Sequence, residues 1–308
     1  MTYRTYDPIE LTPHLYQLGT PAFPVYLSMG EDGMLIEGGV RGTAQMVVDQ
    51  LKKLGIDPQK IKYVALTHSH PDHIGAVPVF KKLWPHLKVL GSPMAAKILS
   101  NPDLLKQFHA TDVSIAQLMA MRNEIERMPE FMLGDNGFEI DRLIKEGDTI
   151  DLGAGIVWSV YDAPGHAPCH LALLEDKEKT LVLGDATGFY NPDEDVFWPN
   201  YFESLESYCN TMRKLAALPA KRAVRSHFGM VQGSVRGFLE KAMKATEAFH
   251  NEFITRAANG ESIPDIALSK GIYVAGIANL QPVQVMIDMC GLMAKRSQKE
   301  KDAVDFSI

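Results

Sequence analysis

The residues best suited to chemistry lie in one short segment, His68-x-His70-x-Asp72-His73. It brings three imidazoles and a carboxylate within six residues, directly after an apolar run over 61–66 that is predicted to be a buried strand. Neutral imidazoles and carboxylates are suitable ligands for zinc, iron or manganese. Burying so many polar groups together is costly unless something pairs with them, as a metal ion would. The segment therefore predicts a metal site at the end of a strand.

Three further polar residues follow other predicted strands. His166 lies in a Pro-Gly-His turn, Asp185 follows the apolar run 181–183, and His227 follows residues 223–226. Each alone is more often structural, but together they repeat one arrangement, in which a strand delivers a polar side chain to one edge of a sheet. Sites in α/β proteins usually lie at such an edge. We therefore expect these three side chains to contribute to one site with the first segment.

In identity, order and approximate spacing, these residues resemble the ligand set of the metallo-β-lactamase superfamily of hydrolases. The resemblance covers roughly residues 10–230 and implies an α/β (α+β) fold, a four-layer αββα sandwich. It also implies two divalent transition-metal ions (zinc, iron or manganese) at one edge of the sandwich. By this resemblance, the first ion is bound by His68, His70 and His166, the second by Asp72, His73 and His227, and Asp185 bridges both.

The resemblance further implies a metal-dependent hydrolase. Two cations about 3.5–4 Å apart lower the pKa of a bridging water, and the resulting hydroxide attacks an electrophilic carbonyl or phosphoryl centre. We expect the substrate to be a thioester or related acyl ester, acyl-CoA included, since the aromatic segment 189–201 suits an apolar acyl group; aromatic core packing is the equal alternative. True β-lactamases of the superfamily typically have Cys where Asp185 stands, which argues against that activity. The alternatives are a lactonase, a phosphodiesterase, a glyoxalase II-like hydrolase and, in another class, a regulatory binding protein that retains the metal site.

Several residues near the expected site have open roles. Asp72 is a candidate proton relay, and Tyr190 is a candidate hydrogen-bond donor to an oxyanion. Glu37 either orients a ligand histidine or lies in a plain surface turn. Cys169 either approaches the site or is a packed thiol at a strand start, and His170 is structural or supports a ligand. The remaining histidines are expected to be structural or surface residues: His14, His86, His109 and His250.

The elements that would position these residues alternate between strand and helix in the first part of the chain. Helices are expected at 43–54 and 75–84, and strands at 61–66 and 88–90. A Met-rich helical insert follows over about 93–130. Within it, a helix is expected over 112–128, with Thr111 or Asp112 as the N-cap. Its apolar stripe faces the core or forms an adaptable wall for an apolar ligand.

Short strands return over 138–183, and the chain is all-helical after residue 230. Helices are expected at 234–258, from Ser262 onward, and at 282–295. We therefore expect a metallo-β-lactamase-like domain over 1–230 and a C-terminal helical extension over 231–308 that caps the site.

Composition narrows the classes of partner. The chain has 308 residues, with 31 Lys and Arg against 38 Asp and Glu, so its formal charge is −7. This balance argues against a basic strip for nucleic acid and against an anionic membrane. The three cysteines form no disulfide framework, and no apolar stretch suits a signal peptide or a transmembrane helix. We expect a cytoplasmic protein that acts on a small acyl substrate and binds neither nucleic acid nor membrane; the apolar insert makes a homodimer plausible.

Overall fold

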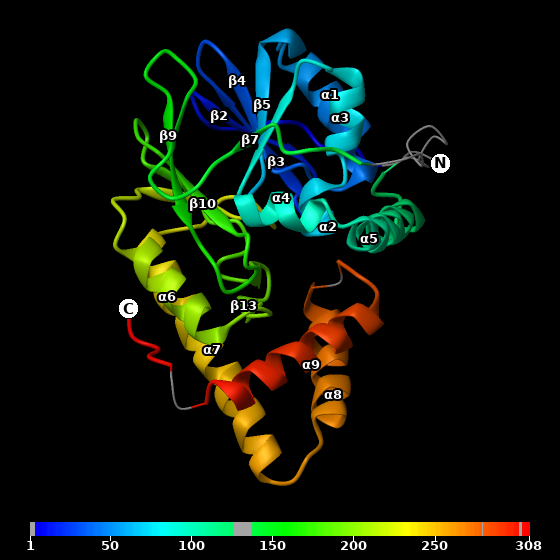
Figure 1. Cartoon of the computed structure of the whole chain (residues 1–308), viewed down its shortest axis with the longest axis vertical. Coiled ribbons are helices and arrows are strands. Elements are labelled where there is room, and N and C mark those ends of the chain that lie inside the picture. Colours follow the sequence, from blue (N-terminus) through cyan, green and yellow to red (C-terminus); the bar gives the residue numbers. More distant parts are fainter. Residues whose placement is uncertain (1–3, 126–136, 279, 302–303) are drawn as a thin grey trace. The chain divides into compact units, whose positions relative to one another are not determined.

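The computed structural model describes residues 4–125, 137–278, 280–301 and 304–308 (Figure 1). The chain divides into two compact units. The first consists of Met1–Tyr161 and Leu173–Glu178, and the second of Asp162–Ala172 and Lys179–Ile308. The segment from His68 to His73 therefore belongs to the first unit, whereas His166, Asp185 and His227 belong to the second.

The first unit is built on a seven-stranded sheet whose strands follow one another in chain order. Neighbouring strands are antiparallel from the first to the fourth and parallel from the fourth to the seventh. Parallel neighbours need long crossover connections, and helices supply them here. The strands predicted at 61–66 and 88–90 are confirmed. The seven strands are β1 (Ile9–Thr12), β2 (Leu15–Gly19), β3 (Pro24–Met29), β4 (Gly33–Ile36), β5 (Ile61–Ala65), β6 (Lys88–Gly91) and β7 (Arg142–Leu143).

Helices α1 and α3 both pack against this sheet (Figure 1). One buried apolar cluster joins Val47 of α1 and Phe80 of α3 to Val64 of β5 and Val89 of β6. Apolar residues at helical spacing thus pack against the apolar face of the strands. Helix α1 confirms the helix predicted at 43–54. The helical elements of the first unit are η1 (Arg41–Thr43), α1 (Ala44–Lys53), η2 (Pro58–Lys60), α2 (Pro71–Ile74), α3 (Val77–Leu83), α4 (Pro93–Leu99) and α5 (Pro102–Met121).

Helix α5 begins ten residues earlier than the sequence pattern suggested. Asn101 is its N-cap, because the Asn101 side chain accepts hydrogen bonds from the first backbone N–H groups, and Pro102 occupies the first turn. The prediction that Thr111 or Asp112 caps this helix is therefore wrong. Asp112 lies inside the helix and is only 2% exposed. The predicted end of the helix, at residues 128–129, lies outside the described residues.

A β-hairpin completes the first unit. Strands β8 (Thr149–Asp151) and β9 (Val157–Asp162) pair antiparallel, close to the strands predicted there. The indole Nε1 of the buried Trp158 donates to the hydroxyl of Ser28 on β3 at 2.9 Å. This hydrogen bond anchors the hairpin to the large sheet. Strand β10 (Leu171–Glu175) is divided between the two units.

The second unit contains a parallel pair and an antiparallel hairpin. Strand β11 (Thr180–Val182) pairs parallel with β14 (Arg222–Val224), and Val182 lies opposite Val224. The aromatic segment forms a hairpin of β12 (Phe189–Asn191) and β13 (Val196–Trp198). The helices of the second unit are α6 (Leu205–Ala216), α7 (Val235–Ala258), α8 (Ile263–Ala278) and α9 (Val283–Lys299).

The last three helices agree closely with the sequence pattern. Ser234 caps α7 through a hydrogen bond from the backbone N–H of Gly237. At the start of α8, the Ser262 hydroxyl donates to Asp265 and also accepts from the Asp265 backbone N–H. The Ser262 hydroxyl thus caps the first turn of the helix that was predicted from Ser262 onward. This helix has 16 residues.

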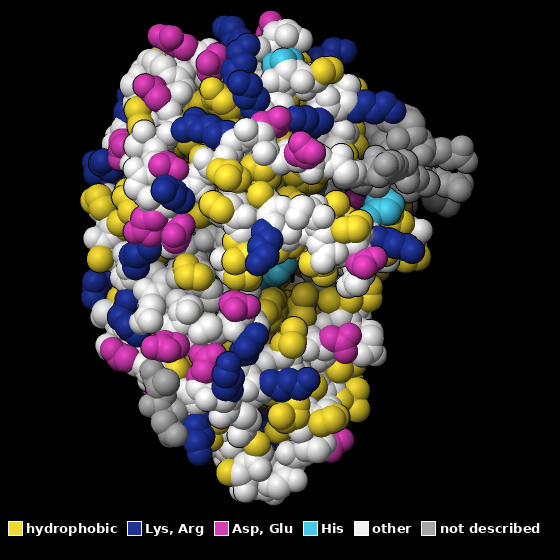
Figure 2. Space-filling view, viewed as in Figure 1, with side chains coloured by type: hydrophobic (Ala, Val, Ile, Leu, Met, Phe, Trp, Pro, Cys, Tyr) yellow, Lys and Arg dark blue, Asp and Glu magenta, His cyan; other side chains and the backbone are white. Residues whose placement is uncertain are grey.

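Basic and acidic side chains are interspersed on the face of the molecule drawn in Figure 2. This mixture agrees with the modest net charge of the sequence. Among the described helices, none combines the length with the apolar character that crossing a bilayer requires.

Candidate metal centre

The first group of candidate ligands lies where β5 leads into α2. Pro71 starts α2, where its missing N–H and fixed φ are tolerated, and the next two residues are Asp72 and His73. His68 is 0% exposed, and Asp72 and His73 are 7% and 2% exposed. A buried strand followed at once by a tight turn into a helix thus brings the polar segment into the interior.

The side chains of this segment converge. His68 Nε2 lies 3.0 Å from His70 Nδ1, and His73 Nε2 lies 3.6 Å from Asp72 Oδ1. The ring centroids of His68 and His73 are 4.0 Å apart. All four predicted ligands of the first segment therefore form one cluster.

Two residues outside the segment orient its imidazoles. Glu37 Oε2 lies 3.1 Å from His73 Nδ1, and Thr67 Oγ1 lies 3.0 Å from His68 Nδ1. The Thr67 hydroxyl also donates to Glu37 Oε1 at 2.7 Å. Glu37 is 1% exposed, so the surface-turn interpretation is wrong and its orienting contact with a candidate ligand is confirmed. The sequence did not single out Thr67.

The second group of candidate ligands meets around one carboxylate in the second unit. Asp185 Oδ2 lies 3.5 Å from His166 Nε2 and 3.7 Å from His227 Nε2. The register explains part of this geometry. Because Val182 is opposite Val224 in a parallel pair, residues three positions beyond each of them, Asp185 and His227, emerge at the same sheet edge.

Backbone contacts orient this group as well. His166 Nδ1 lies 2.9 Å from the carbonyl oxygen of Asn200, which can only accept. The backbone N–H of Asp185 donates to His170 Nε2 at 2.9 Å. His170 therefore supports a candidate ligand, which is one of its two expected roles. Cys169 is buried at 2% exposure, as expected for a packed thiol.

The donor set of each group fits a metal ion. Ligand atoms bound at 2.0–2.1 Å to a tetrahedral ion stand roughly 3.3 Å apart, close to the 3.5 Å and 3.6 Å separations found here. A neutral imidazole whose Nδ1–H donates to a carbonyl or carboxylate carries its lone pair on Nε2. In His166 and His73 that lone pair then faces a carboxylate oxygen. A shared cation relieves this repulsion, so these residues can hold a metal.

Aromatic rings lie next to two candidate ligands of the second unit. The ring centroid of Phe202 is 5.2 Å from that of His166, and the ring of Phe189 is 5.9 Å from that of His227. Phe197 and Trp198 are buried, as core packing predicts.

Tyr190, the proposed oxyanion donor, is engaged in this structure. Its hydroxyl donates to Asp195 Oδ1 at 2.5 Å, and Lys241 Nζ also contacts Asp195. Burial and the hydrogen bond to Asp195 raise the pKa of Tyr190, which keeps the hydroxyl protonated at neutral pH. Its role toward an oxyanion stays a prediction.

Comparison with known proteins agrees with this geometry. Residues 25–227 match the family model of the metallo-beta-lactamase superfamily. A probable metallo-hydrolase of Bacillus subtilis, YqjP, is 27% identical over 232 residues, 70% of each chain. A putative diflavin flavoprotein of Nostoc is 24% identical over 66% of this chain but only 33% of its own length.

Solved structures agree in fold. The metallo-beta-lactamase family protein TTHA1429 of Thermus thermophilus has a TM-score of 0.69 at 23% identity, over 96% of both chains. BJP-1, a subclass B3 metallo-beta-lactamase of Bradyrhizobium japonicum, has a TM-score of 0.59 at 18% identity, over 84% of this chain and 98% of its own. The expected fold class, mixed sheets and helices with a helical C-terminal region, is confirmed. With its ligand-bearing segments inside the matched region, the chain belongs to the metallo-beta-lactamase superfamily.

Proposed function

We propose that the two groups of candidate ligands form one dinuclear metal site. Asp185 Oδ2 carries this proposal, because a single carboxylate oxygen lies within 3.7 Å of imidazoles that the family resemblance assigns to different ions. In the proposed site, His68, His70 and His166 bind the first ion, Asp72, His73 and His227 bind the second, and Asp185 bridges them.

When bound, two such ions lower the pKa of a shared water and polarise the carbonyl oxygen of a substrate. The chain's own residues hold the ligands in place. Glu37 fixes the ring of His73, the Asn200 carbonyl fixes His166, and His170 fixes the backbone of Asp185. We assign Asp72 a second task, to accept a proton at its carboxylate and pass it on.

We propose that the substrate is a thioester or a related acyl ester. The partly exposed ring of Phe202 beside His166 supports this, because it offers apolar surface to an acyl group next to the reacting centre. A thiolate is a good leaving group and needs little acid assistance. The reaction therefore requires no strong general acid from the chain.

A hydrolysis panel tests the substrate. The metal-loaded protein is assayed against an acyl-CoA, an acyl-glutathione, a homoserine lactone and bis-p-nitrophenyl phosphate. We expect the highest kcat/KM for the acyl-CoA. A preference for the lactone, the glutathione thioester or the phosphodiester would overturn the substrate in favour of the corresponding alternative. Metal-loaded protein that cleaves none of them would favour a regulatory binding protein.

Elemental analysis tests the metal site. Protein purified without added metal is expected to hold about two transition-metal ions per chain. Asp185→Ala is expected to lose metal and activity together. The matched control is His14→Gln, since His14 contacts Lys177 and belongs to neither ligand group. An Asp185→Ala variant that keeps both ions and the full rate would show the bridging assignment to be wrong.

A further inference from the structure

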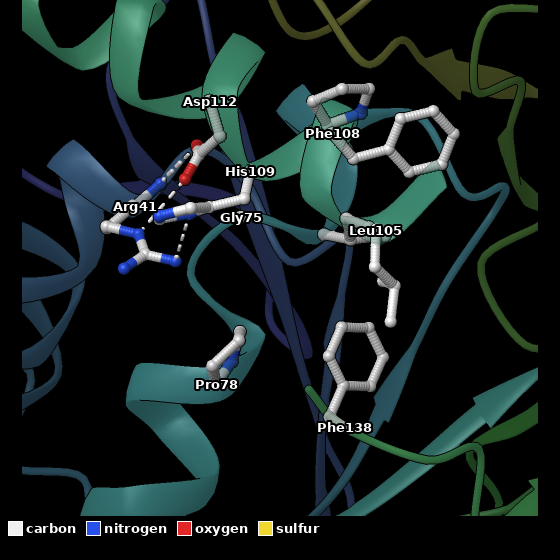
Figure 3. A pocket seen from close by; sticks show the side chains of 10 residues that line it. Arg41, Gly75, Pro78, Leu105, Phe108, His109, Asp112 and Phe138 are labelled. Atoms are coloured by element: carbon white, nitrogen blue, oxygen red, sulfur yellow. Dashed lines mark hydrogen bonds and ion pairs between the residues drawn. The ribbon is translucent and has the colours of Figure 1, made fainter. Parts of the chain in front are cut away.

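A buried ion pair lies outside the candidate ligands. Arg41 of η1 and Asp112 of α5 are 1% and 2% exposed. Asp112 Oδ2 accepts from Arg41 Nε at 3.1 Å, and Asp112 Oδ1 accepts from the Arg41 backbone N–H at 2.9 Å. The guanidinium also lies 3.2 Å from His109 Nδ1 (Figure 3). This pair joins two segments that are 71 residues apart in the sequence.

The pair is pressed against the helix that carries two candidate ligands. A Cβ atom placed on Gly75, the C-cap of α2, would stand 2.1 Å from Asp112 Oδ1 and 2.9 Å from the Arg41 backbone nitrogen. The carboxylate therefore fits into the space that the absent side chain leaves. Asp112 thus fixes the end of α2, whose first turn holds Asp72 and His73.

The loop before Arg41 is bound to the same helix. The Gly38 backbone N–H donates to the His73 carbonyl at 2.7 Å, and the Ala76 N–H donates to the Gly39 carbonyl at 3.3 Å. At one end of this loop Glu37 holds the ring of His73, and at the other end Arg41 is held by Asp112. A displacement of Arg41 would therefore shift the loop and disturb the contacts of Glu37 and Gly38 with His73.

A small pocket adjoins the pair. Ile74 and Pro78, together with Leu105 and Phe108 of α5 and Phe138, line a small pocket that also contains Arg41 and Asp112 (Figure 3). Burial raises the pKa of the Asp112 carboxyl to about 6, although the contacts with Arg41 act in the opposite direction. Burial of the charge and its pairing with Arg41 therefore act in opposite directions on the ionisation of Asp112.

We propose that Arg41 and Asp112 form a positioning pair, which holds the loop from Glu37 to Arg41 against α2 and so sets the orientation of Asp72 and His73. The proposal rests on the proposed function, in which these two ligands bind the second ion. It predicts a selective effect. Disturbing the pair weakens the binding of one ion and leaves the other, held by His68, His70 and His166, nearly unchanged.

The test measures the affinity of each ion by competition with a chelator, in wild type and in Asp112→Asn. The amide keeps the shape of the side chain but removes its charge. We expect one of the two ions to bind about 10- to 100-fold more weakly, as is typical when a group that orients a ligand is changed. Arg41→Lys keeps the charge but loses the guanidinium that contacts both Asp112 and His109. It is expected to act in the same direction and covers the case in which Asp112→Asn does not fold.

Glu175→Gln is the matched control, because Glu175 is an equally buried carboxylate (3% exposed) that accepts from the backbone N–H groups of Lys177 and Glu178 in a separate turn. A double variant with Glu37→Gln supplies a further readout. If the pair acts through the loop, the losses of affinity from Glu37→Gln and Asp112→Asn are not additive.

The outcomes separate the two proposals. Unchanged affinity for both ions in the variants, an equal loss of both ions, or additive effects in the double variant would overturn the positioning role. A wild-type protein that never holds two ions would instead overturn the proposed dinuclear site.

Discussion

Gly75→Ala is expected to destabilise the protein, although alanine suits this backbone better than glycine. Gly75 has φ −58° and ψ −37°, the right-handed helical conformation. Alanine is favoured over glycine there by up to about 1 kcal/mol in helix propensity. The result therefore depends on the space around the new methyl group.

That space is occupied by buried polar groups. The Cβ would lie 2.1 Å from Asp112 Oδ1 and 2.6 Å from its Cγ, so the carboxylate must move by more than about an ångström to reach van der Waals contact. This motion breaks the hydrogen bonds from Arg41. Overpacking costs about 1–3 kcal/mol, and a hydrogen bond to a charged group contributes about 1.5–3 kcal/mol. After the gain in helix propensity, we expect a net loss of about 2–4 kcal/mol.

Urea unfolding followed by circular dichroism, with a chelator present so that metal contributes nothing, measures the loss. Gly276→Ala is the control, since Gly276 lies in α8 and a Cβ there would meet nothing within 4 Å. It is expected to gain about 0.5–1 kcal/mol. If Gly75→Ala were as stable as wild type, the carboxylate would have room to yield, and the close fit of Asp112 against α2 would be refuted.

Three other changes have defined outcomes. Because the folded state raises the pKa of Asp112 from 3.8 to about 6, the folded protein binds more protons than the unfolded chain between these values; the free energy of unfolding of the chelator-treated wild type should fall by about 2 kcal/mol relative to that of Asp112→Asn as the pH rises from 4 to 6, and a flat difference in urea titrations would contradict this. Trp158→Phe removes the hydrogen bond to buried Ser28 and should lower the free energy of unfolding by about 1–3 kcal/mol, measured by urea titration against Trp84→Phe. Ser92→Ala removes the N-cap that accepts from the backbone of α4 and should cost about 1 kcal/mol, visible as a lower melting temperature; no change would show that water replaces the cap.

The candidate ligands could be predicted from the sequence because local rules place them. A buried strand followed by a turn positions the residues from His68 to His73 within one connection. The same rule predicts that Asp185 and His227 come together, since each follows its strand by three residues and those strands are parallel neighbours. The first prediction needs no distant contact, whereas the second depends on the pairing of β11 with β14, two strands that are far apart in the sequence.

The groups that orient the ligands were harder to predict, because their partners are far away in the sequence. Asp112 stands before an apolar run and looks like a helix N-cap, and only the fold shows that its partner is Arg41, 71 residues earlier. Glu37 is 36 residues from His73. A local pattern cannot distinguish such a carboxylate from one in a surface turn, because both follow a strand and both are flanked by glycine.

Two residues with strained backbone lie beside candidate ligands. Glu37 has φ 72° and Phe228, directly after His227, has φ 60°, both in the left-handed region that favours glycine. For other residues this conformation costs on the order of 1 kcal/mol or more. Glycine at position 37 would relieve the strain, but it would remove the carboxylate that contacts Thr67 and His73. The strained conformation of Glu37 is therefore explained by its carboxylate, which a glycine would lack. The strain lies at the residue that orients the candidate metal ligand His73.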